Sequence, residues 1–210
     1  MKKTIVLGTG GHAKVVIDLL LADPAIDVIG CTGTGKNELN SVPLLGDDSI
    51  LPKLVLQGVS HAFVAVGNNR VRARLAKTVR DLGLELVNAV SPFAYISPSA
   101  ALGSGIAVMP GAVINAGTRI GDLSIINTGA SVDHDGNIGE ACHIAPGSSL
   151  AGNVTVGSYS FLGTGVKVID GIRIGNHCMI GAGAAVIRDI PDGVTAVGVP
   201  ARIIKQEKRS

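Results

Sequence analysis

The sequence has little of what marks a disulfide-stapled, nucleic-acid-binding or membrane protein. Its 210 residues include three cysteines, two tyrosines, three phenylalanines and no tryptophan. The cysteines form no C-x-x-C pair, and their odd number argues against a disulfide framework, so we expect them in the core. The formal net charge is +2, and no basic run occurs before the last few residues. Nucleic acid is therefore not an expected partner.

No apolar run is long enough to cross a bilayer. The longest, residues 15–22, is interrupted by Asp18 and is far shorter than the roughly 20 residues that a membrane-spanning helix needs. The N-terminus begins with two lysines and a short apolar run, as signal peptides do, but glycines at 8, 10 and 11 end that run at once. These observations predict a soluble, cytoplasmic protein.

A period of six residues dominates the second half of the sequence. From Ile96 to Val186 a branched aliphatic residue stands at every sixth position without a shift of register. Neither a helix, with a period of 3.6, nor an amphipathic strand, with a period of 2, produces this pattern. It is typical of a β-solenoid, in which short strands joined by tight corners bury their aliphatics between coils. The scarcity of aromatic residues suits such a narrow core.

The repeat resembles the hexapeptide repeat of the left-handed β-helix acyltransferases. In that family three hexads form one triangular coil, so the resemblance implies left-handed winding and about five coils. Residues 18 apart would then stack in columns. One column has no charged or amide side chain and is predicted to form a groove for the pantetheine arm of CoA; it comprises Thr128, Pro146, Thr164, Ala182 and Pro200.

The first 90 residues have the pattern of a βαβ unit instead. We expect strands at 3–7, 28–31, 62–66 and 84–87 and helices at 13–21 and 70–82. The predicted fold class is therefore α/β + all-β. A Rossmann-like βαβ domain covers residues 1–90, and a parallel β-helix of hexapeptide repeats covers residues 91–210.

The glycine-rich turn at residues 8–12 has three interpretations. It resembles a dinucleotide-binding turn, but residues 31–33 lack the acidic partner that NAD would require. It is alternatively a tight strand-to-helix turn capped by His12. We favour a phosphate or nucleotide pocket shared with the loop at 67–69, since both lie at the carboxyl ends of parallel strands. Asn68 and Asn69 either donate to the ligand or cap the next helix.

Histidine is the usual base for acyl transfer to an amine or hydroxyl near neutral pH. His134 stands between Asp133 and Asp135, and an adjacent carboxylate raises the basicity of an imidazole and fixes its tautomer. The alternative is a solvated corner. His143 either donates to a thioester carbonyl or packs at a subunit seam. His61 and His177 are expected to face solvent.

A metal site is not predicted. The candidate histidines and carboxylates form no i, i+4 pair on a helix, and no cysteine lies in a ligand pattern.

An ordered set of motifs covers nearly the whole chain: Gly8-x-Gly-Gly-His-Ala-Lys14, Val66-Gly-Asn-Asn69, Ile126-Asn-Thr-Gly129, Val132-Asp-His-Asp135, Leu150-Ala-Gly-Asn153, Phe161-Leu-Gly163 and Gly198-Val-Pro-Ala201. This set resembles the sugar O- and N-acyltransferases of the sialic acid O-acetyltransferase type, which include the bacillosamine-pathway and perosamine N-acetyltransferases. One departure from that family is the absence of its acidic pair after the second strand, for which Lys36 and Asn37 are candidate replacements.

The resemblance implies transfer of an acetyl group from acetyl-CoA to a sugar, foremost to the amine of a nucleotide-linked 4-amino-4,6-dideoxy hexose. It implies a homotrimer with each active site between adjacent subunits. The implied roles are general base for His134 with Asp135 as its partner, acetyl-CoA contacts for His143, Thr164 and Ala182, and a substrate contact for His12. Gly10, Gly11, Gly67 and Asn68 are expected to contact the nucleotide sugar as well, because they share the position of His12 at the strand ends.

Two other functions stay open at this point. Within the family, the alternative is O-acetylation of a sialic acid or a related acceptor. The alternative of another class is a non-catalytic solenoid scaffold whose N-terminal domain binds a nucleotide; such a scaffold would have no need of the Asp-His-Asp sequence.

Overall fold

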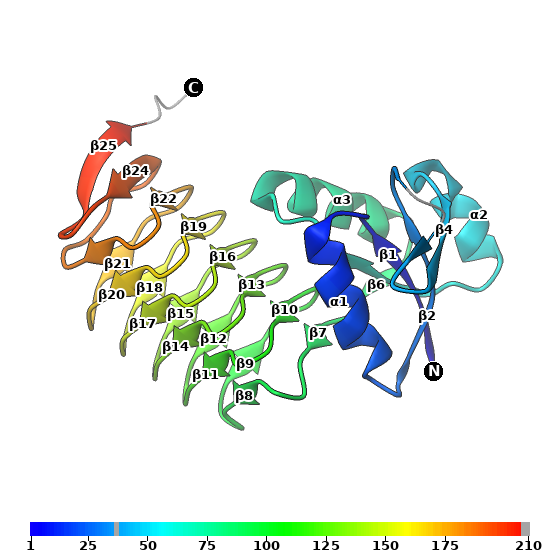
Figure 1. Ribbon diagram of the computed structural model, residues 1–210, viewed down its shortest axis with the longest axis horizontal. Helices are drawn as coiled ribbons and strands as arrows, with labels where there is room; N and C mark the ends of the chain where they lie inside the picture. The colour runs from blue at the N-terminus through cyan, green and yellow to red at the C-terminus, as the bar shows by residue number, and fades with distance from the viewer. Residues whose placement is uncertain (36–37, 207–210) are drawn as a thin grey trace. The chain divides into compact units, whose positions relative to one another are not determined.

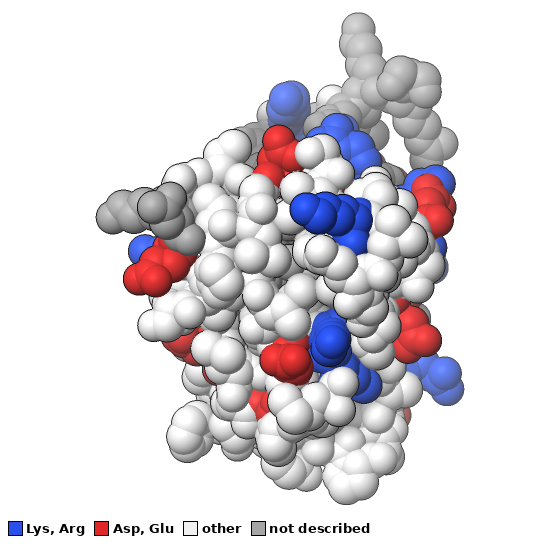
Figure 2. Space-filling model, turned by 90° about the vertical axis from the view of Figure 1, so that its right-hand side faces the viewer, with Lys and Arg blue, Asp and Glu red and all other residues white. Residues whose placement is uncertain are grey.

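The computed structural model describes residues 1–35 and 38–206. Lys36 and Asn37, the candidate replacements for the acidic pair, lie outside the described residues, as does most of the basic tail. The chain forms two compact units, Met1–Pro92 and Phe93–Ser210 (Figure 1). Figure 2 shows a face on which basic and acidic side chains are interspersed, in keeping with the small net charge.

The N-terminal unit is built on a six-stranded sheet with the order β3-β4-β2-β1-β5-β6. The strands are parallel except for β3, which runs antiparallel to β4. The elements are β1 (Lys2–Leu7), α1 (Gly11–Leu21), β2 (Ile26–Thr32), β3 (Glu38–Leu39), β4 (Val42–Gly46), η1 (Asp48–Ile50), α2 (Leu51–Leu56), β5 (His61–Val64), α3 (Asn69–Asp81), β6 (Glu85–Leu86) and β7 (Ala89–Val90).

The core of this unit follows from the apolar strands. Ile5, Val6 and Leu7 of β1 are fully buried, as expected for a central parallel strand covered on both faces. The predicted Rossmann-like arrangement is confirmed. The sequence analysis missed β3, β4, η1 and α2, because residues 38–56 carry no sustained apolar period.

The C-terminal unit is a left-handed parallel β-helix, as predicted. From β8 to β20, each two-residue strand pairs in parallel with the strand 18 residues later, as Val113 does with Ser131 and Ser131 with Ser149. The strands are β8 (Tyr95–Ile96), β9 (Ala101–Leu102), β10 (Ala107–Val108), β11 (Val113–Ile114), β12 (Arg119–Ile120), β13 (Ile125–Ile126), β14 (Ser131–Val132), β15 (Asn137–Ile138), β16 (His143–Ile144), β17 (Ser149–Leu150), β18 (Thr155–Val156), β19 (Phe161–Leu162), β20 (Lys167–Val168), β21 (Arg173–Ile174), β22 (Met179–Ile180), β23 (Ala185–Val186), β24 (Val194–Val197) and β25 (Arg202–Gln206).

Three sheets form the sides of the prism. One contains β10, β13, β16, β19 and β22, the second runs from β8 through β11, β14, β17 and β20 to β23, and the third contains β9, β12, β15, β18 and β21. From Val108 onwards the periodic aliphatics are at most 3% exposed. The six-residue period therefore produces the core that the sequence predicts.

A repeated hydrogen-bond device satisfies the polar groups between coils. The Ser124 hydroxyl donates to the Gly139 carbonyl at 2.8 Å and accepts from the backbone N–H of Cys142 at 3.0 Å. Two coils later, the Ser160 hydroxyl makes the corresponding pair of bonds. It donates to the Gly175 carbonyl and accepts from the backbone N–H of Cys178. All three cysteines are buried, as predicted for core residues, and burial raises the pKa of the Cys178 thiol.

Three columns of corner residues separate the sheets. The glycine corner contains Thr128, Pro146, Thr164 and Ala182, each followed by a glycine with positive φ. The histidine corner contains Ala116, His134, Gly152 and Asp170. The capped corner contains Asp122, Glu140, Ser158 and Asn176.

One member of the predicted groove column is wrong. Met179 pairs with Thr195 and Ile180 with Ala196, a separation two residues shorter than in the coils below. Gly198 therefore follows Ala182 in the column, and Pro200 lies beyond it. The shorter connection between β23 and β24 causes the shift, because Ile190 already bridges Ile174.

Candidate active site

His134 lies in the histidine corner, directly after β14. Its Nδ1 is 3.0 Å from Oδ2 of Asp135, and the two side chains are 53% and 64% exposed. This hydrogen bond raises the pKa of His134 above its usual value, and Asp133, Asp135 and Asp170 add to the effect through their charges. With Nδ1 held by a carboxylate, Nε2 is the nitrogen that can take a proton from an acceptor.

Asp133 holds the backbone of the same corner. Its Oδ1 accepts from Nδ2 of Asn115 at 2.9 Å and from the backbone N–H of His134 at 2.8 Å. These bonds favour the carboxylate and lower the pKa of Asp133, the backbone bond contributing most. The two aspartates beside His134 thus have different tasks: Asp133 fixes its backbone and Asp135 fixes its ring.

The ring of His134 lies against Gly152, one coil later in the same column. A Cβ added at Gly152 would stand 2.5 Å from Nε2 of His134 and 2.9 Å from Oδ1 of Asp170. Glycine is therefore the residue that leaves room for the imidazole. Sequence reasoning missed Gly152 and Asp170 as site residues, although the 18-residue column that contains His134 was a signal for both.

His143 lies on β16 and is half-buried. Its Nε2 is 3.0 Å from Nδ2 of Asn127, and Phe161 meets its ring edge-on at a centroid distance of 5.1 Å. Within one chain, β15 and the capped corner stand between His134 and His143 along the coil. The chain therefore carries the two histidines at different places on its perimeter.

Thr164 and Ala182 are both exposed on the glycine corner. The glycines that follow them, Gly165 and Gly183, have φ values of 72° and 68°, and a Cβ at either would meet nothing within 4 Å. The backbone at these two glycines therefore faces open space.

The glycine turn of the N-terminal unit combines a structural glycine with open ones. Gly8 has a φ of +124°, and its Cβ would stand 2.7 Å from the Ala65 carbonyl oxygen, so the turn itself demands glycine there. A Cβ at Gly10, Gly11 or Gly67 would instead meet nothing within 4 Å. Gly10 is the N-cap of α1 and provides no side-chain cap, so this helix terminus is suited to a phosphate.

His12 lies in the first turn of α1 and does not cap it, which corrects one of the three interpretations of the turn. Its Nε2 is buried and has no hydrogen-bond partner within the described chain. Burial, assisted by the charge of Arg72, lowers the pKa of His12 to about 4. His12 is therefore neutral at pH 7 and has a nitrogen suited to a ligand.

Arg72 is 1% exposed and holds the loop that follows β5. Its guanidinium donates to the carbonyl oxygens of Val66 and Gly67 at 2.9 and 3.0 Å and to Oδ1 of Asn69 at 2.8 Å. Asn68 caps α3 by accepting from the Val71 N–H at 3.0 Å. The oxygens of both asparagines are thus used within the loop. Sequence reasoning did not single out Arg72, because a basic helix face is usually solvated.

A cavity of about 400 Å³ lies in the N-terminal unit beside the glycine turn. It is lined by Thr9, Lys14, Gly35, Glu38, Leu39 and Asn40. Thr9 donates from its hydroxyl to the Thr34 carbonyl, which ties the turn to the segment after β2. The missed strand β3 therefore supplies one wall of this cavity.

His61 and His177, the other two histidines, differ in exposure. His177 is exposed and stacks on Tyr159 at 5.0 Å, so its predicted exposure is confirmed. The prediction for His61 is wrong: its side chain is only 15% exposed and its Nε2 lies 3.5 Å from Glu85. In the described ranges, no three His, Cys, Asp or Glu side chains are grouped to hold a metal, and no helix there is long and apolar enough to span a bilayer.

Comparison with known proteins places the chain in a family. Residues 3–79 match the family described as the PglD N-terminal domain. A perosamine N-acetyltransferase from Caulobacter crescentus, solved as a histidine-to-asparagine variant in complex with CoA and GDP-perosamine, is 50% identical, with 97% of each chain covered and a TM-score of 0.93. The chain belongs to this family of sugar acyltransferases.

Other members of the sugar acyltransferase family agree. The acetyltransferase domain of PglB from Neisseria gonorrhoeae FA1090, solved with acetyl coenzyme A, is 37% identical with a TM-score of 0.92, covering 97% of this chain and 99% of that one. A UDP-N-acetylbacillosamine N-acetyltransferase from Bacillus subtilis (strain 168) is 39% identical over 121 residues, 52% of each protein. The chain spans 52% and 19% of the two curated relatives it matches.

Proposed function

We propose that this chain transfers the acetyl group of acetyl-CoA to the amine of a nucleotide-linked 4-amino-4,6-dideoxy sugar. The observation that carries the proposal is the exposed His134–Asp135 pair, with Nδ1 bonded to the carboxylate at 3.0 Å. The relative of 50% identity that was solved with CoA and GDP-perosamine supports the choice of substrates.

In this proposal His134 is the general base and Asp135 its partner. Nε2 accepts a proton from the acceptor while the acceptor's nitrogen attacks the thioester carbonyl carbon. The C–N bond forms, the C–S bond breaks, and the departing thiolate takes a proton. A negative carboxylate at Nδ1 favours the imidazolium that forms during transfer.

Residues 1–90 are proposed to bind the nucleotide sugar. The support is that Gly10, Gly11 and Gly67 face open space and that the buried Nε2 of His12 has no partner in the described chain. Asn68, the N-cap of α3, contributes through its Nδ2. The cavity beside Thr9 and Lys14 extends this surface towards β3.

Residues 91–210 are proposed to bind acetyl-CoA along the glycine corner, past Thr164 and Ala182 towards His143. The open glycines of that corner support a narrow ligand such as the pantetheine arm. His143 is half-buried on β16, where its Nε2 lies 3.0 Å from Nδ2 of Asn127, and its imidazole is proposed to contact the thioester.

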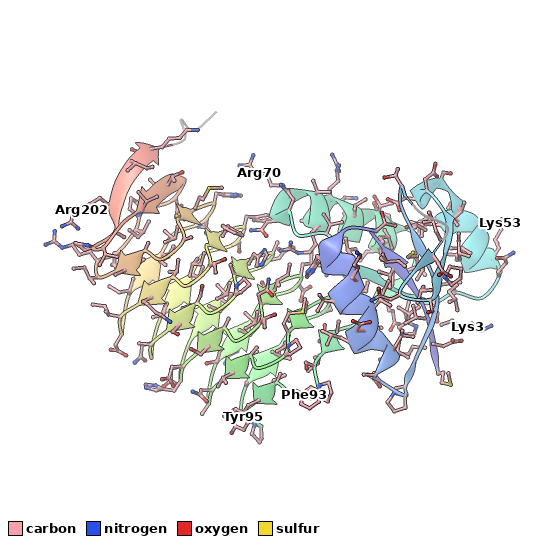
Figure 3. All side chains as sticks on the ribbon, in the orientation of Figure 1. Lys3, Lys53, Arg70, Phe93, Tyr95 and Arg202 are labelled. Atoms are coloured by element: carbon pink, nitrogen blue, oxygen red, sulfur yellow. The ribbon has the colours of Figure 1, made fainter. Side chains whose placement is uncertain are left out.

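A homotrimer, with each active site between adjacent subunits, is part of the proposal. One chain carries His134 and His143 at different places on its perimeter. A second copy could bring its own His143 close to His134 of the first, which supports a shared site. Apolar side chains on the outer faces also support it, among them Tyr95, which is 55% exposed (Figure 3), and Met179, which is 53% exposed. Sedimentation equilibrium at micromolar concentration tests it, and a fully active monomer would contradict it.

The activity is tested by following thiol release from acetyl-CoA with a panel of GDP- and UDP-linked 4-amino sugars, each beside its 4-hydroxy analogue. The expected result is turnover with at least one amino sugar and an N-acetylated product by mass spectrometry. Turnover only with hydroxyl acceptors would favour O-acetylation, and binding of nucleotide without any turnover would favour a scaffold.

A further inference from the structure

The histidine corner contains a carboxylate that the general-base scheme does not use. Asp170 follows His134 in the same column, two coils later, and is exposed. Its Oδ1 accepts from Nδ2 of Asn153 at 3.3 Å. Asn153 is the neighbour of Gly152, so the intervening coil holds this carboxylate beside the place where the imidazole lies.

The missing side chain of Gly152 brings Asp170 and His134 to one space. Nε2 of His134 and Oδ1 of Asp170 both lie within 3 Å of the position that a Cβ of residue 152 would occupy. The backbone of Gly152 is not in the left-handed region, so its conformation does not require glycine. The imidazole and the carboxylate require it.

The ring of His134 is therefore close to two carboxylates with different partners. Asp135 is bonded to Nδ1, whereas Oδ1 of Asp170 shares the space over Gly152 with the Nε2–Cε1 edge of the ring, which is the edge that the proposed scheme turns to the acceptor. A carboxylate at that point attracts an ammonium group and offers no such advantage to a neutral hydroxyl.

We propose that Asp170 binds the acceptor's amine as an ammonium in the notch over Gly152, and thereby makes the site selective for amino sugars over hydroxy sugars. This inference rests on the proposed function. It concerns which acceptor is chosen, whereas the general-base scheme concerns how a proton is removed.

The transfer balances with an ammonium as the entering species. One proton passes from R–NH₃⁺ to Nε2 of His134, and the nitrogen attacks the carbonyl carbon. As the C–N bond forms and the C–S bond breaks, the imidazolium returns that proton to the departing sulfur. A second proton leaves the nitrogen to water, so that R–NH₃⁺ and acetyl-CoA give the amide, the CoA thiol and one H⁺.

The test compares Asp170→Asn with the native protein, using a nucleotide-linked 4-amino sugar and its 4-hydroxy analogue. Dissociation constants are measured by calorimetry and acetyl transfer by thiol release. We expect Asp170→Asn to weaken binding of the amino sugar by roughly ten- to a hundredfold, the range for losing a hydrogen bond to a charged group. Binding of the hydroxy sugar, the KM for acetyl-CoA and the thermal midpoint should stay unchanged.

Two further variants sharpen this test. Gly152→Ala should lower kcat and amino-sugar affinity together, since its methyl group displaces both the imidazole and the carboxylate, without lowering the thermal midpoint. Asp81→Asn is the charge-matched control, because it removes one exposed carboxylate that pairs with Lys77 in the other unit; it should change neither affinity.

The outcomes separate this inference from the proposed function. An unchanged ratio of amino-sugar to hydroxy-sugar affinity in Asp170→Asn would overturn the role of Asp170, even if the native protein acetylates amines. A native protein that binds nucleotide amino sugars but transfers no acetyl group would overturn the proposed function, while the affinity ratio would still report on Asp170.

Discussion

The histidine corner and the capped corner occupy equivalent places in the repeat but use their polar side chains differently. In the capped corner, side chains bond to the backbone of the coil before them: Ser158 Oγ accepts from the Glu140 N–H at 3.1 Å and Asn176 Oδ1 from the Ser158 N–H at 2.9 Å. In the histidine corner, side chains bond to other side chains, His134 to Asp135 and Asp170 to Asn153. Bonds to the backbone hold the coils together, whereas bonds between exposed side chains orient groups that can act on a ligand.

Two glycines, one immediately before the capped corner and one within the histidine corner, differ in the same way. A Cβ at Gly157, before the capped corner, would stand 2.5 Å from the backbone N of Asn176. At Gly152 the nearest atoms belong to side chains of His134 and Asp170. Gly157 therefore permits the coils to stack, and Gly152 leaves room for the imidazole of His134.

The largest effect on activity is expected from a substitution of His134 in the histidine corner. His134→Ala should lower acetyl transfer by roughly 10²–10⁴, the usual contribution of a general base, and leave acetyl-CoA affinity and the thermal midpoint nearly intact. Ser158→Ala is the matched change in the capped corner. It should lower the thermal midpoint and leave the rate of acetyl transfer nearly unchanged. Steady-state rates and thermal midpoints of both variants are measured. Near-native turnover of His134→Ala would show that His134 is not the general base.

A second test moves from side chains to glycines. Gly157→Ala should destabilise the fold by roughly 1–3 kcal/mol, the range for overpacking, because its methyl group meets backbone that cannot shift. Denaturant unfolding measures the loss, with Gly152→Ala as the comparison. Equal stability of the two variants would contradict the distinction between Gly157, which lies against backbone, and Gly152, which lies against side chains.

The third test concerns the glycine corner. Ala182→Trp should fill the proposed groove and raise the KM for acetyl-CoA severalfold or more, while nucleotide-sugar affinity and the thermal midpoint stay unchanged. Ala182 is exposed and its neighbour Gly183 faces open space, so a large ring is tolerated without strain. An unchanged KM in a folded variant would place the cofactor along another edge.

The smallest expected effect is a shift in pH dependence. The base form of His134 is the neutral imidazole, so the rate rises with pH through its pKa, which the bond to Asp135 raises. Asp135→Asn removes that cause, and the rising limb of the pH–rate profile should move to lower pH. A limb that stays in place, measured with the native protein alongside, would show that Asp135 does not set the basicity of His134.

The sequence predicts the β-helix because its signal is local and repeated. Each aliphatic residue from Val108 to Val186 independently reports the same six-residue period, and stacking at 18 residues follows from three hexads per coil. His134 and His143 emerge as candidates from the chemistry of acyl transfer and from the motifs around them, since those depend on neighbouring residues.

The rest depends on contacts that a linear pattern does not record. The shorter connection after β23 shifts the column by two residues and moves Pro200 out of it. Strand β3 lines the cavity beside Thr9 although residues 38–39 are too few to show a period. Whether Gly152 serves a turn or an imidazole is decided by backbone angles and by the rotamer of His134, which the sequence does not contain.

The 18-residue register also limits how this fold can change in length. Inserting one whole coil would leave every later residue in its column, so the new protein would have a longer prism with the same three edges. Inserting a single hexad would keep the aliphatic core intact but rotate everything after it by one corner, and a hexad placed between His134 and His143 would carry His143 to another side. A change of any other length has to be absorbed in a connection between strands, as in the one after β23 that is two residues shorter than the others. Within the coils, changes of length therefore come in two kinds: single hexads exchange the edges, and whole coils preserve them.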